Sequence, residues 1–329
     1  MTRSTTPRAR PASGPVPRSG MAFAAGAYLM WGFLPVYFVL LAPAGAFEIV
    51  AWRVIFSLVF CAILIVVTRA WRTFRAVLAS RRTVLIMGLA GALIYVNWQT
   101  YVLGVVTGHV VEAALGYFIN PVVTVLLGVL VQQERLRPAQ WTAVGISVAA
   151  ILVISVGYGH VPWIALILAF SFGSYGLVKK RVADRVDAVS GLTLETVWLT
   201  PVAVVQLIVV GALGGLVFGT AGTVNTLLML GTGIVTAVPL LLFAAASRRL
   251  PLVWVGFFQY ITPIIQFLVG VLMLHETMPL ERWLGFALVW VALIVLSADM
   301  VRSARRHRGP GGEPGADAGV PTGETILPE

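Results

Sequence analysis

The chain of 329 residues is 59% hydrophobic and only 11% charged, which is too little charge to cover a water-soluble protein of this size. The formal net charge of +10 would suit a nucleic-acid-binding protein, but the basic residues lie between apolar runs and form no single patch. A single cysteine, Cys61, excludes a disulfide framework and a cysteine metal cluster. We therefore expect an integral membrane protein with no nucleic-acid partner, no cofactor and no metal.

The two ends of the chain are polar. Residues 1–19 are rich in Pro, Arg, Ser and Thr, and residues 302–329 combine a basic cluster with a run of Gly, Pro and Glu. Segments of this composition cannot bury enough apolar surface to fold by themselves. We expect two disordered tails around a membrane-embedded body.

Between the tails, apolar runs are long enough to cross a bilayer as helices. A helix needs roughly 20 mainly apolar residues to span a hydrocarbon core about 30 Å thick. Charged residues and Gly/Pro breaks separate ten such runs, which predict an all-α integral membrane protein with ten transmembrane helices. In chain order the predicted spans are residues 21–42, 46–68, 83–105, 110–131, 139–157, 162–178, 189–211, 224–246, 252–274 and 280–300.

The basic residues between these runs predict an orientation. With ten spans, both ends of the chain lie on the same side of the membrane. If that side is the cytoplasm, 21 of the 23 Lys and Arg residues are cytoplasmic, and the exceptions are Arg53 within a span and Arg282 on the outer side. Because cytoplasmic loops are enriched in Lys and Arg, we expect both termini in the cytoplasm.

An internal repeat divides the predicted body into two parts. Shifted by 142 residues, segment 116–153 aligns without a gap with segment 258–295, with ten identities in 38 positions. The repeat pairs span four with span nine, so each unit holds five helices, residues 20–158 and 159–301. An odd number of helices inserts the second unit upside down, as in many secondary transporters, which bind substrate between such units. The rarer identities are Pro121 with Pro263, Gly128 with Gly270, Glu134 with Glu276, and Trp141 with Trp283.

Ionisable side chains inside a span are costly and are candidates for function. Four of them lie in the apolar runs: Glu48, Arg53, Glu112 and Glu195. One interpretation pairs Arg53 with Glu112, because both lie in the outer portions of their spans. The alternative role is structural, as a buried pair that only fixes helix packing or, for Glu48, as an acid in a first helical turn.

Neutral polar groups extend this pattern. In span four, Glu112, Gly116 and Asn120 share one helix face beside Pro121, and span nine carries a similar stripe beside Pro263. Because proline frees a backbone carbonyl, we expect two Pro-broken polar faces around a central cavity. The alternative is hydrogen bonding between helices. The predicted substrate-binding or coupling residues are Arg53, Asn97, Trp98, Glu112, Tyr117, Asn120, Glu195, Gln259, Tyr260 and Gln266, with Glu48, Glu134 and Glu276 as additional candidates.

The sequence carries no motif for catalysis. It lacks a Gly-rich phosphate loop with a Lys, so no ATP-driven pump is indicated, and its four histidines lack metal-ligand spacing. No polar segment is long enough to be a catalytic domain. We therefore expect that the chain is not an enzyme and that any transport draws on a gradient.

Several motifs resemble those of the RarD family, a branch of the EamA-type transporters in the drug/metabolite transporter superfamily. Residues 112–121 (EAALGYFINP) resemble the family signature, and residues 170–177 (FSFGSYGL) and 256–261 (GFFQYI) match in family order. The resemblance covers about residues 21–300. It implies a ten-span permease of the cell inner (plasma) membrane, with duplicated five-helix EamA units and cytoplasmic ends.

The sequence and the resemblance together favour a secondary transporter of a small organic metabolite or drug. Alternating access would rock one five-helix unit against the other, with protons coupled through Glu112 or Glu195 as the candidate energy source. The expected partners are a small-molecule substrate and the lipid bilayer, and a homodimer is compatible with the sequence. The alternative is a non-transporting membrane scaffold or sensor, although the tails are short for an output domain.

Overall fold

The computed structural model describes residues 17–132, 136–182, 184–250 and 252–306, and every regular element in these ranges is helical. Of the predicted tails, only residues 17–19 and 302–306 are described. All of these residues except Pro17 belong to helices. The elements are α1 (Arg18–Gly32), α2 (Leu34–Val39), α3 (Ala46–Val67), α4 (Trp71–Leu78), α5 (Arg81–Val106), α6 (Val110–Gln132), α7 (Pro138–Tyr158), α8 (Trp163–Lys180), α9 (Ala188–Ala212), α10 (Thr223–Ser247), α11 (Leu252–Gln259), α12 (Ile261–Leu268), the π-helical turn η1 (Val269–Met273) and α13 (Leu280–Arg306).

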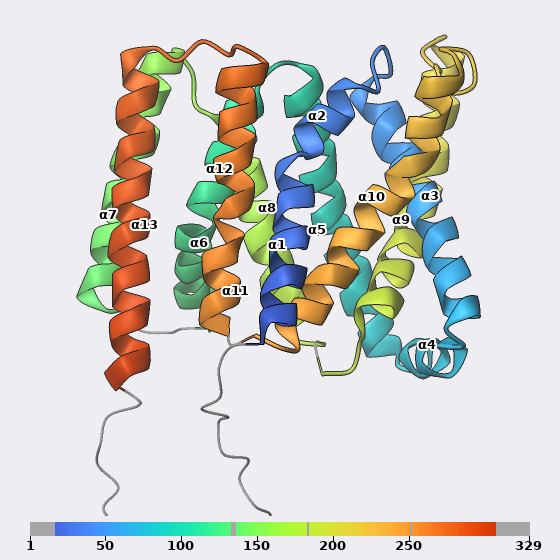
Figure 1. Ribbon diagram of the computed structural model, residues 1–329, viewed down its shortest axis with the longest axis horizontal. Coiled ribbons are helices and arrows are strands. Elements are labelled where there is room, and N and C mark those ends of the chain that lie inside the picture. Colours follow the sequence, from blue (N-terminus) through green and yellow to red (C-terminus); the bar gives the residue numbers. More distant parts are fainter. Residues whose placement is uncertain (1–16, 133–135, 183, 251, 307–329) are drawn as a thin grey trace, which may run out of the picture.

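The long helices pass up and down between two edges of one bundle (Figure 1). The start of α1 and the end of α13 lie at the same edge, which we call the terminal edge, and the opposite edge is the far edge. The turns at residues 181–187 and 248–250 and the short helix α4 lie at the terminal edge. Residues 40–45, 107–109, 159–162, 213–222 and 274–279 form the far edge.

Nine described segments are long and apolar enough to cross a membrane. They correspond to nine of the ten predicted spans, with bounds shifted by a few residues. The sixth predicted span, α8, is not among them, because two of its 18 residues are the lysines Lys179 and Lys180. The nine segments are Arg18–Val39, Ala46–Val67, Arg81–Val106, Val110–Val131, Pro138–Gly157, Ala188–Ala212, Thr223–Ser247, Trp254–Met273 and Leu280–Asp299.

Proline divides two of these segments, whereas α6, α9 and α10 continue through an internal proline. The first segment consists of α1 and α2, which meet at Phe33, and Pro35 stands in the first turn of α2, where a missing N–H costs little. The segment that includes Pro263 is also divided, between α11 and α12. By contrast, α6 continues through Pro121. The expectation of two Pro-broken spans is therefore correct for span nine and wrong for span four.

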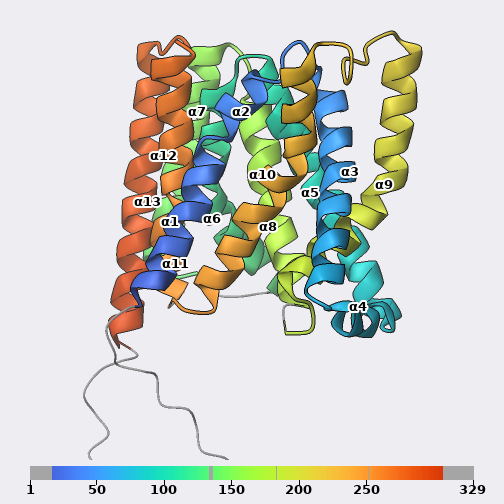
Figure 2. The same ribbon diagram turned by 45° about the vertical axis from the view of Figure 1, so that its right-hand side comes forward.

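The short helix α4 was not expected from the sequence. It lies across the terminal edge beside α5 and α9 (Figures 1 and 2). Its Phe74 and Val77 are buried, whereas Trp71 is half exposed and Arg75 stacks on the Trp71 ring at 5.5 Å. A basic helix with one apolar face is typical of the membrane–water interface.

Helix packing repeats itself between the two predicted halves. The α6–α8 and α5–α8 contacts have counterparts in α12–α1 and α10–α1, and the α3–α10 contact has a counterpart in α9–α5. The equivalent helices α6 and α12 are antiparallel, because Glu276, just beyond the end of η1, bonds to the first residues of α6. This packing brings residues from both halves into the centre of the bundle.

Replacing Gly233 by alanine should push α10 away from α3. An added Cβ would lie 2.4 Å from the carbonyl oxygen of Phe56, which is backbone and cannot rotate away. Overpacking of this kind typically costs about 1–3 kcal/mol, so we expect Gly233→Ala to lower the melting temperature of the protein in detergent. Gly145→Ala on α7, where nothing lies within 4 Å, is the matched control. Equal melting temperatures for the two variants would contradict this packing.

Candidate functional site

One arginine is buried inside the bundle. Arg53 lies on α3, and only 4% of its surface is exposed. Its Nε donates to Oγ1 of Thr236 on α10 at 2.8 Å. The guanidinium carbon lies 4.2 Å from the ring centroid of Trp98 and 5.5 Å from that of Phe38. Aromatic faces attract a cation but do not neutralise it, and Nη1 has no hydrogen-bond partner among the described residues.

A tyrosine–glutamine pair lies next to this arginine. Tyr101 on α5 packs edge-on against the Phe38 ring, with the centroids 6.1 Å apart. Its hydroxyl accepts a hydrogen bond of 3.0 Å from Nε2 of Gln266 on α12. The same Nε2 also donates to the carbonyl of Trp31 at 3.1 Å. This pair therefore connects α12 to α5 and to α1, across the boundary between the predicted halves.

Asn97 extends the polar region from α5 to α8. Its Nδ2 donates to the carbonyl of Leu168 and to Oγ of Ser171, both at 3.2 Å. Its Oδ1 accepts from the hydroxyl of Tyr117 at 3.1 Å. Tyr37, whose ring packs edge-on against that of Phe38, donates its hydroxyl hydrogen to the carbonyl of Leu228. We call the following residues the central cluster: Tyr37, Phe38, Arg53, Asn97, Trp98, Tyr101, Tyr117, Thr236 and Gln266.

The predicted pair of Arg53 with Glu112 is wrong. Glu112 is buried in the first turn of α6, and its Oε1 accepts from the backbone N–H of Ile164, near the start of α8, at 2.9 Å. The first N–H groups of a helix lack partners within the helix and attract a carboxylate, so they take the place of the arginine. Ion pairs among the described residues join Arg137 to Asp299 at 3.1 Å and Lys179 to Glu195 at 2.8 Å, and neither includes Arg53 or Glu112.

Glu48 also binds backbone N–H groups at the far edge. Its side chain is fully buried, and it accepts from the N–H of Val217 at 2.9 and 3.1 Å and from that of Phe218 at 2.8 Å. Glu48 belongs to the first predicted half and its donors to the second. It therefore holds the turn before α10 against the start of α3.

Glu276 makes the same kind of contact, but here the acid belongs to the second predicted half and its donors belong to the first. From the turn after η1, it accepts from the N–H groups of Val110 and Val111 at 2.5 and 3.0 Å. Burial raises the pKa of the Glu276 carboxyl above its ordinary value, although the two N–H bonds act in the other direction. Glu48, Glu112 and Glu276, which we call the far-edge acids, each join one predicted half to the other.

Glu195 lies near the terminal edge with a different set of partners. Its Oε1 is 2.8 Å from Nζ of Lys179 and accepts from the hydroxyl of Tyr175 at 3.2 Å. Nζ of Lys179 also donates to that hydroxyl at 2.5 Å. All three residues belong to α8 and α9. Glu195 is therefore a paired acid away from the central cluster.

The expected polar face of α6 packs against α8. A Cβ added at Gly116 would lie 2.7 Å from the carbonyl oxygen of Ala165, so the two helices are in close backbone contact there. Asn120 is 4% exposed and faces Gly173 of α8. This face is consequently a helix–helix interface, and only Tyr117 of α6 joins the central cluster.

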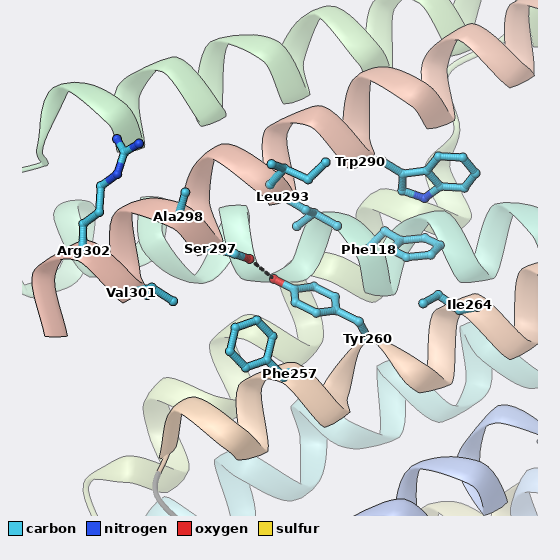
Figure 3. A pocket seen from close by; sticks show the side chains of 11 residues that line it. Phe118, Phe257, Tyr260, Ile264, Trp290, Leu293, Ser297, Ala298, Val301 and Arg302 are labelled. Atoms are coloured by element: carbon cyan, nitrogen blue, oxygen red, sulfur yellow. Dashed lines mark hydrogen bonds between the residues drawn. The ribbon is translucent and has the colours of Figure 1, made fainter. Parts of the chain in front are cut away.

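A cavity of about 790 Å³ lies between α6, α11, α12 and α13 (Figure 3). Tyr260 points into it and lies 3.4 Å from the hydroxyl of Ser297, so it does not join the central cluster as expected (Figure 3). Gln259, its neighbour, is half-buried at the end of α11. The lining residues are Phe118, Phe257, Tyr260, Ile264, Trp290, Leu293, Ile294, Ser297, Ala298, Val301 and Arg302.

The structure thus divides the predicted site residues among several places. Arg53, Asn97, Trp98, Tyr117 and Gln266 meet in the central cluster, whereas Glu134 lies outside the described residues. Sequence reasoning did not include three members of the cluster in the site, because aromatic and hydroxyl side chains in apolar spans usually only pack. These three are Tyr37, Phe38 and Thr236.

Comparison with known proteins identifies the family. The model of the EamA-like transporter family matches residues 18–156. The protein RarD of Streptomyces exfoliatus is 46% identical over 291 residues, 88% of this chain and 92% of the relative. The protein RarD of Escherichia coli K12 is 39% identical over 88% of this chain and 97% of its own.

Two further similarities are more distant. A chloramphenicol-sensitive protein RarD of Pseudomonas aeruginosa is 30% identical over 88% of this chain and 96% of its own. One solved crystal structure covers 88% of this chain and 99% of its own with a TM-score of 0.56 at 18% identity. That likeness therefore concerns the fold alone.

Glu48→Gln should destabilise the protein at the far edge. An amide oxygen at the position of Oε1 carries no negative charge, and the amide NH2 at the position of Oε2 would face the N–H of Val217, a donor against a donor. Hydrogen bonds to charged groups contribute about 1.5–3 kcal/mol, and we expect a corresponding fall in melting temperature. Asp184→Asn, at an exposed acid of the terminal edge, is the control. If both variants melt alike, Glu48 does not hold the far edge.

The stability of the protein should also depend on the protonation of Glu276. Because the pKa of this carboxyl is raised in the fold, folding favours its neutral form. Its stabilising contribution is largest below the ordinary carboxyl pKa and is lost as pH rises through the raised pKa. We expect the melting temperature of the wild type, relative to Glu276→Gln, to fall as pH rises across that window. A difference that stays constant with pH would contradict the raised pKa.

Proposed function

The chain belongs to the RarD proteins of the EamA-like transporter family, which is not a family of enzymes, and from this premise we propose that it is a secondary transporter of a small organic metabolite or drug. The observation that carries the proposal is the central cluster. A charged and polar site inside a membrane-embedded bundle is costly and marks a substrate pathway by default. Here both predicted halves contribute to it, through the Arg53–Thr236 and Tyr101–Gln266 bonds.

The architecture that we propose has ten spans in two inverted five-helix halves, residues 20–158 and 159–301. The tenth span is α8, because it packs against α5 and α6 as α1 packs against α10 and α12. The antiparallel course of α6 and α12 supports the inversion, as does the end of the EamA-like match at residue 156.

We propose that the protein lies in the inner membrane of the cell and that its terminal edge faces the cytoplasm. The described basic residues other than Arg53 support this orientation, since all except Arg282 belong to the ends of helices and the turns at the terminal edge, and cytoplasmic loops are enriched in Lys and Arg. The far-edge acids then lie at the outer face of the membrane. The bonds that they make between the halves would close the central cluster to the outside.

Alternating access follows from this arrangement. To open the cluster outward, one half must move against the other, and the bonds of the far-edge acids must break. Glu112 is the group that we propose for proton coupling, because its Oε2 has no partner among the described residues. A proton on Oε2 would remove the buried negative charge of Glu112, whereas Glu195 already has Lys179 as its ion partner.

Uptake into proteoliposomes tests the proposed function. The purified protein would be reconstituted and given a panel of radiolabelled small metabolites together with chloramphenicol, with and without an imposed pH gradient. We expect protein-dependent accumulation of at least one compound and a response to the gradient that Glu112→Gln abolishes. Accumulation that Glu112→Gln leaves gradient-dependent would refute the coupling site. The absence of any protein-dependent flux would favour a non-transporting scaffold or sensor.

A cross-link at the far edge tests alternating access. An added Cβ at Gly270 would lie 2.7 Å from Cγ2 of Val111, so cysteines at these two positions should form a disulfide between the halves once Cys61 is replaced by alanine. We expect oxidation to stop uptake of the transported compound and reduction to restore it.

The matched control lies within one half. A Cβ at Gly104 would be 3.8 Å from Cβ of Ala113, and both positions are near the same edge. Oxidising the Gly104→Cys/Ala113→Cys variant should leave uptake unchanged. If the cross-link between the halves also leaves uptake unchanged, the far edge does not open during transport.

A further inference from the structure

Arg53 has no counter-ion among the described residues. The acid on the same helix, Glu48, is bound to backbone N–H groups at the far edge, and so are Glu112 and Glu276. Glu195 has Lys179 as its ion partner. Each of these acids thus has another partner, and the positive charge of Arg53 is left without a negative one.

Packing does not compensate this charge. Removing an ion from water costs several kcal/mol, even after the protein relaxes around it. The cation–π contacts with Trp98 and Phe38 recover only part of this cost, and the single bond to Thr236 occupies only Nε. A leucine or methionine at this position would avoid the cost. The fold therefore keeps a buried cation, with Nη1 unpartnered, at an energetic disadvantage.

A second unused donor belongs to a side chain that contacts the same phenylalanine ring as this guanidinium. The Tyr101 hydroxyl accepts from Gln266, and its own hydrogen is donated to no described residue. Tyr101 and Arg53 both pack on the Phe38 ring. Two donors beside one ring match the oxygens of a carboxylate or phosphate, since a guanidinium binds such groups with a fixed planar geometry.

We infer that the substrate is a small organic anion whose carboxylate or phosphate group binds Arg53 and the Tyr101 hydroxyl. The rings of Trp98 and Phe38 take the apolar part of the molecule next to the charge. This inference rests on the proposed transport function and adds the chemical class of the substrate. The anion supplies the missing counter-charge, so binding removes the disadvantage of the empty site and favours the closed cluster.

Matched probes of one shape and different charge test this assignment. The purified full-length protein in detergent would be titrated with phenylacetate, phenyl phosphate, phenylacetamide and 2-phenylethylamine, and the shift in melting temperature recorded. We expect one or both anions to stabilise the wild type and the amide and amine to have no effect. The stronger of the two anions distinguishes a carboxylate from a phosphate substrate.

Variants at the site make the test specific. Arg53→Met should weaken anion binding about 10- to 100-fold, because a hydrogen-bonded ionic contact contributes about 1.5–3 kcal/mol. Tyr101→Phe removes only the hydroxyl and should weaken binding less. Arg75→Met is the matched control, since Arg75 also stacks on a tryptophan but at an exposed position of α4, and it should bind as the wild type does.

The outcomes separate this inference from the proposed function. Stabilisation by the amide equal to that by the anions, no stabilisation by any probe, or unchanged anion binding in Arg53→Met would overturn the anion site. If proteoliposomes accumulate a neutral compound and Arg53→Met does so equally well, the transporter stands and the anion site is wrong. If anions bind through Arg53 but no compound is moved, the site stands and the transport function is wrong.

Discussion

The structure depends on the absence of water around buried backbone N–H groups and charges, which water would otherwise hydrogen-bond. In a bilayer, a backbone N–H without an acceptor and a charge without a partner each cost several kcal/mol, so the protein must supply every partner itself. Helices satisfy their own interiors but leave the first N–H groups of each helix open. The far-edge acids Glu48, Glu112 and Glu276 fill this role, each for a turn or helix of the other predicted half. The requirement for internal partners thus becomes the contact that joins the halves.

Arg53 is the exception to this pattern, and the proposed substrate site would account for it. The same membrane-embedded body that provides partners for Glu48, Glu112, Glu195 and Glu276 leaves this guanidinium between two aromatic rings with Nη1 unpartnered. A protein under selection for stability alone would replace it by an apolar side chain. A buried charge at a point where helices of both predicted halves meet would suit a substrate site. A bound ligand would then supply the partner that the protein does not provide for this charge.

The polar groups are also distributed in a way that suits a moving bundle. Bonds of the far-edge acids cross between the halves, whereas the Lys179–Glu195 pair stays within α8 and α9. Gly116 and Gly233 bring helices into backbone contact, where small movements have large steric consequences. A rocking motion would therefore exchange a few well-defined contacts and leave most of the packing intact. The cavity beside Tyr260 lies away from these contacts, between α13 and the helices α11 and α12.

Hydrophobicity, charge distribution and the internal repeat are properties of the linear chain, so they were enough to predict the class of the protein. Nine of the ten predicted spans, the helical class and the family resemblance follow from those patterns. The partners of Arg53 and Glu112 were decided only by the tertiary structure, since both residues bond to positions far away in the chain, at Thr236 and Ile164. A local pattern shows that a charge is buried, but the group that meets it depends on how helices pack. For that reason sequence reasoning found Arg53 and gave it the wrong neighbour.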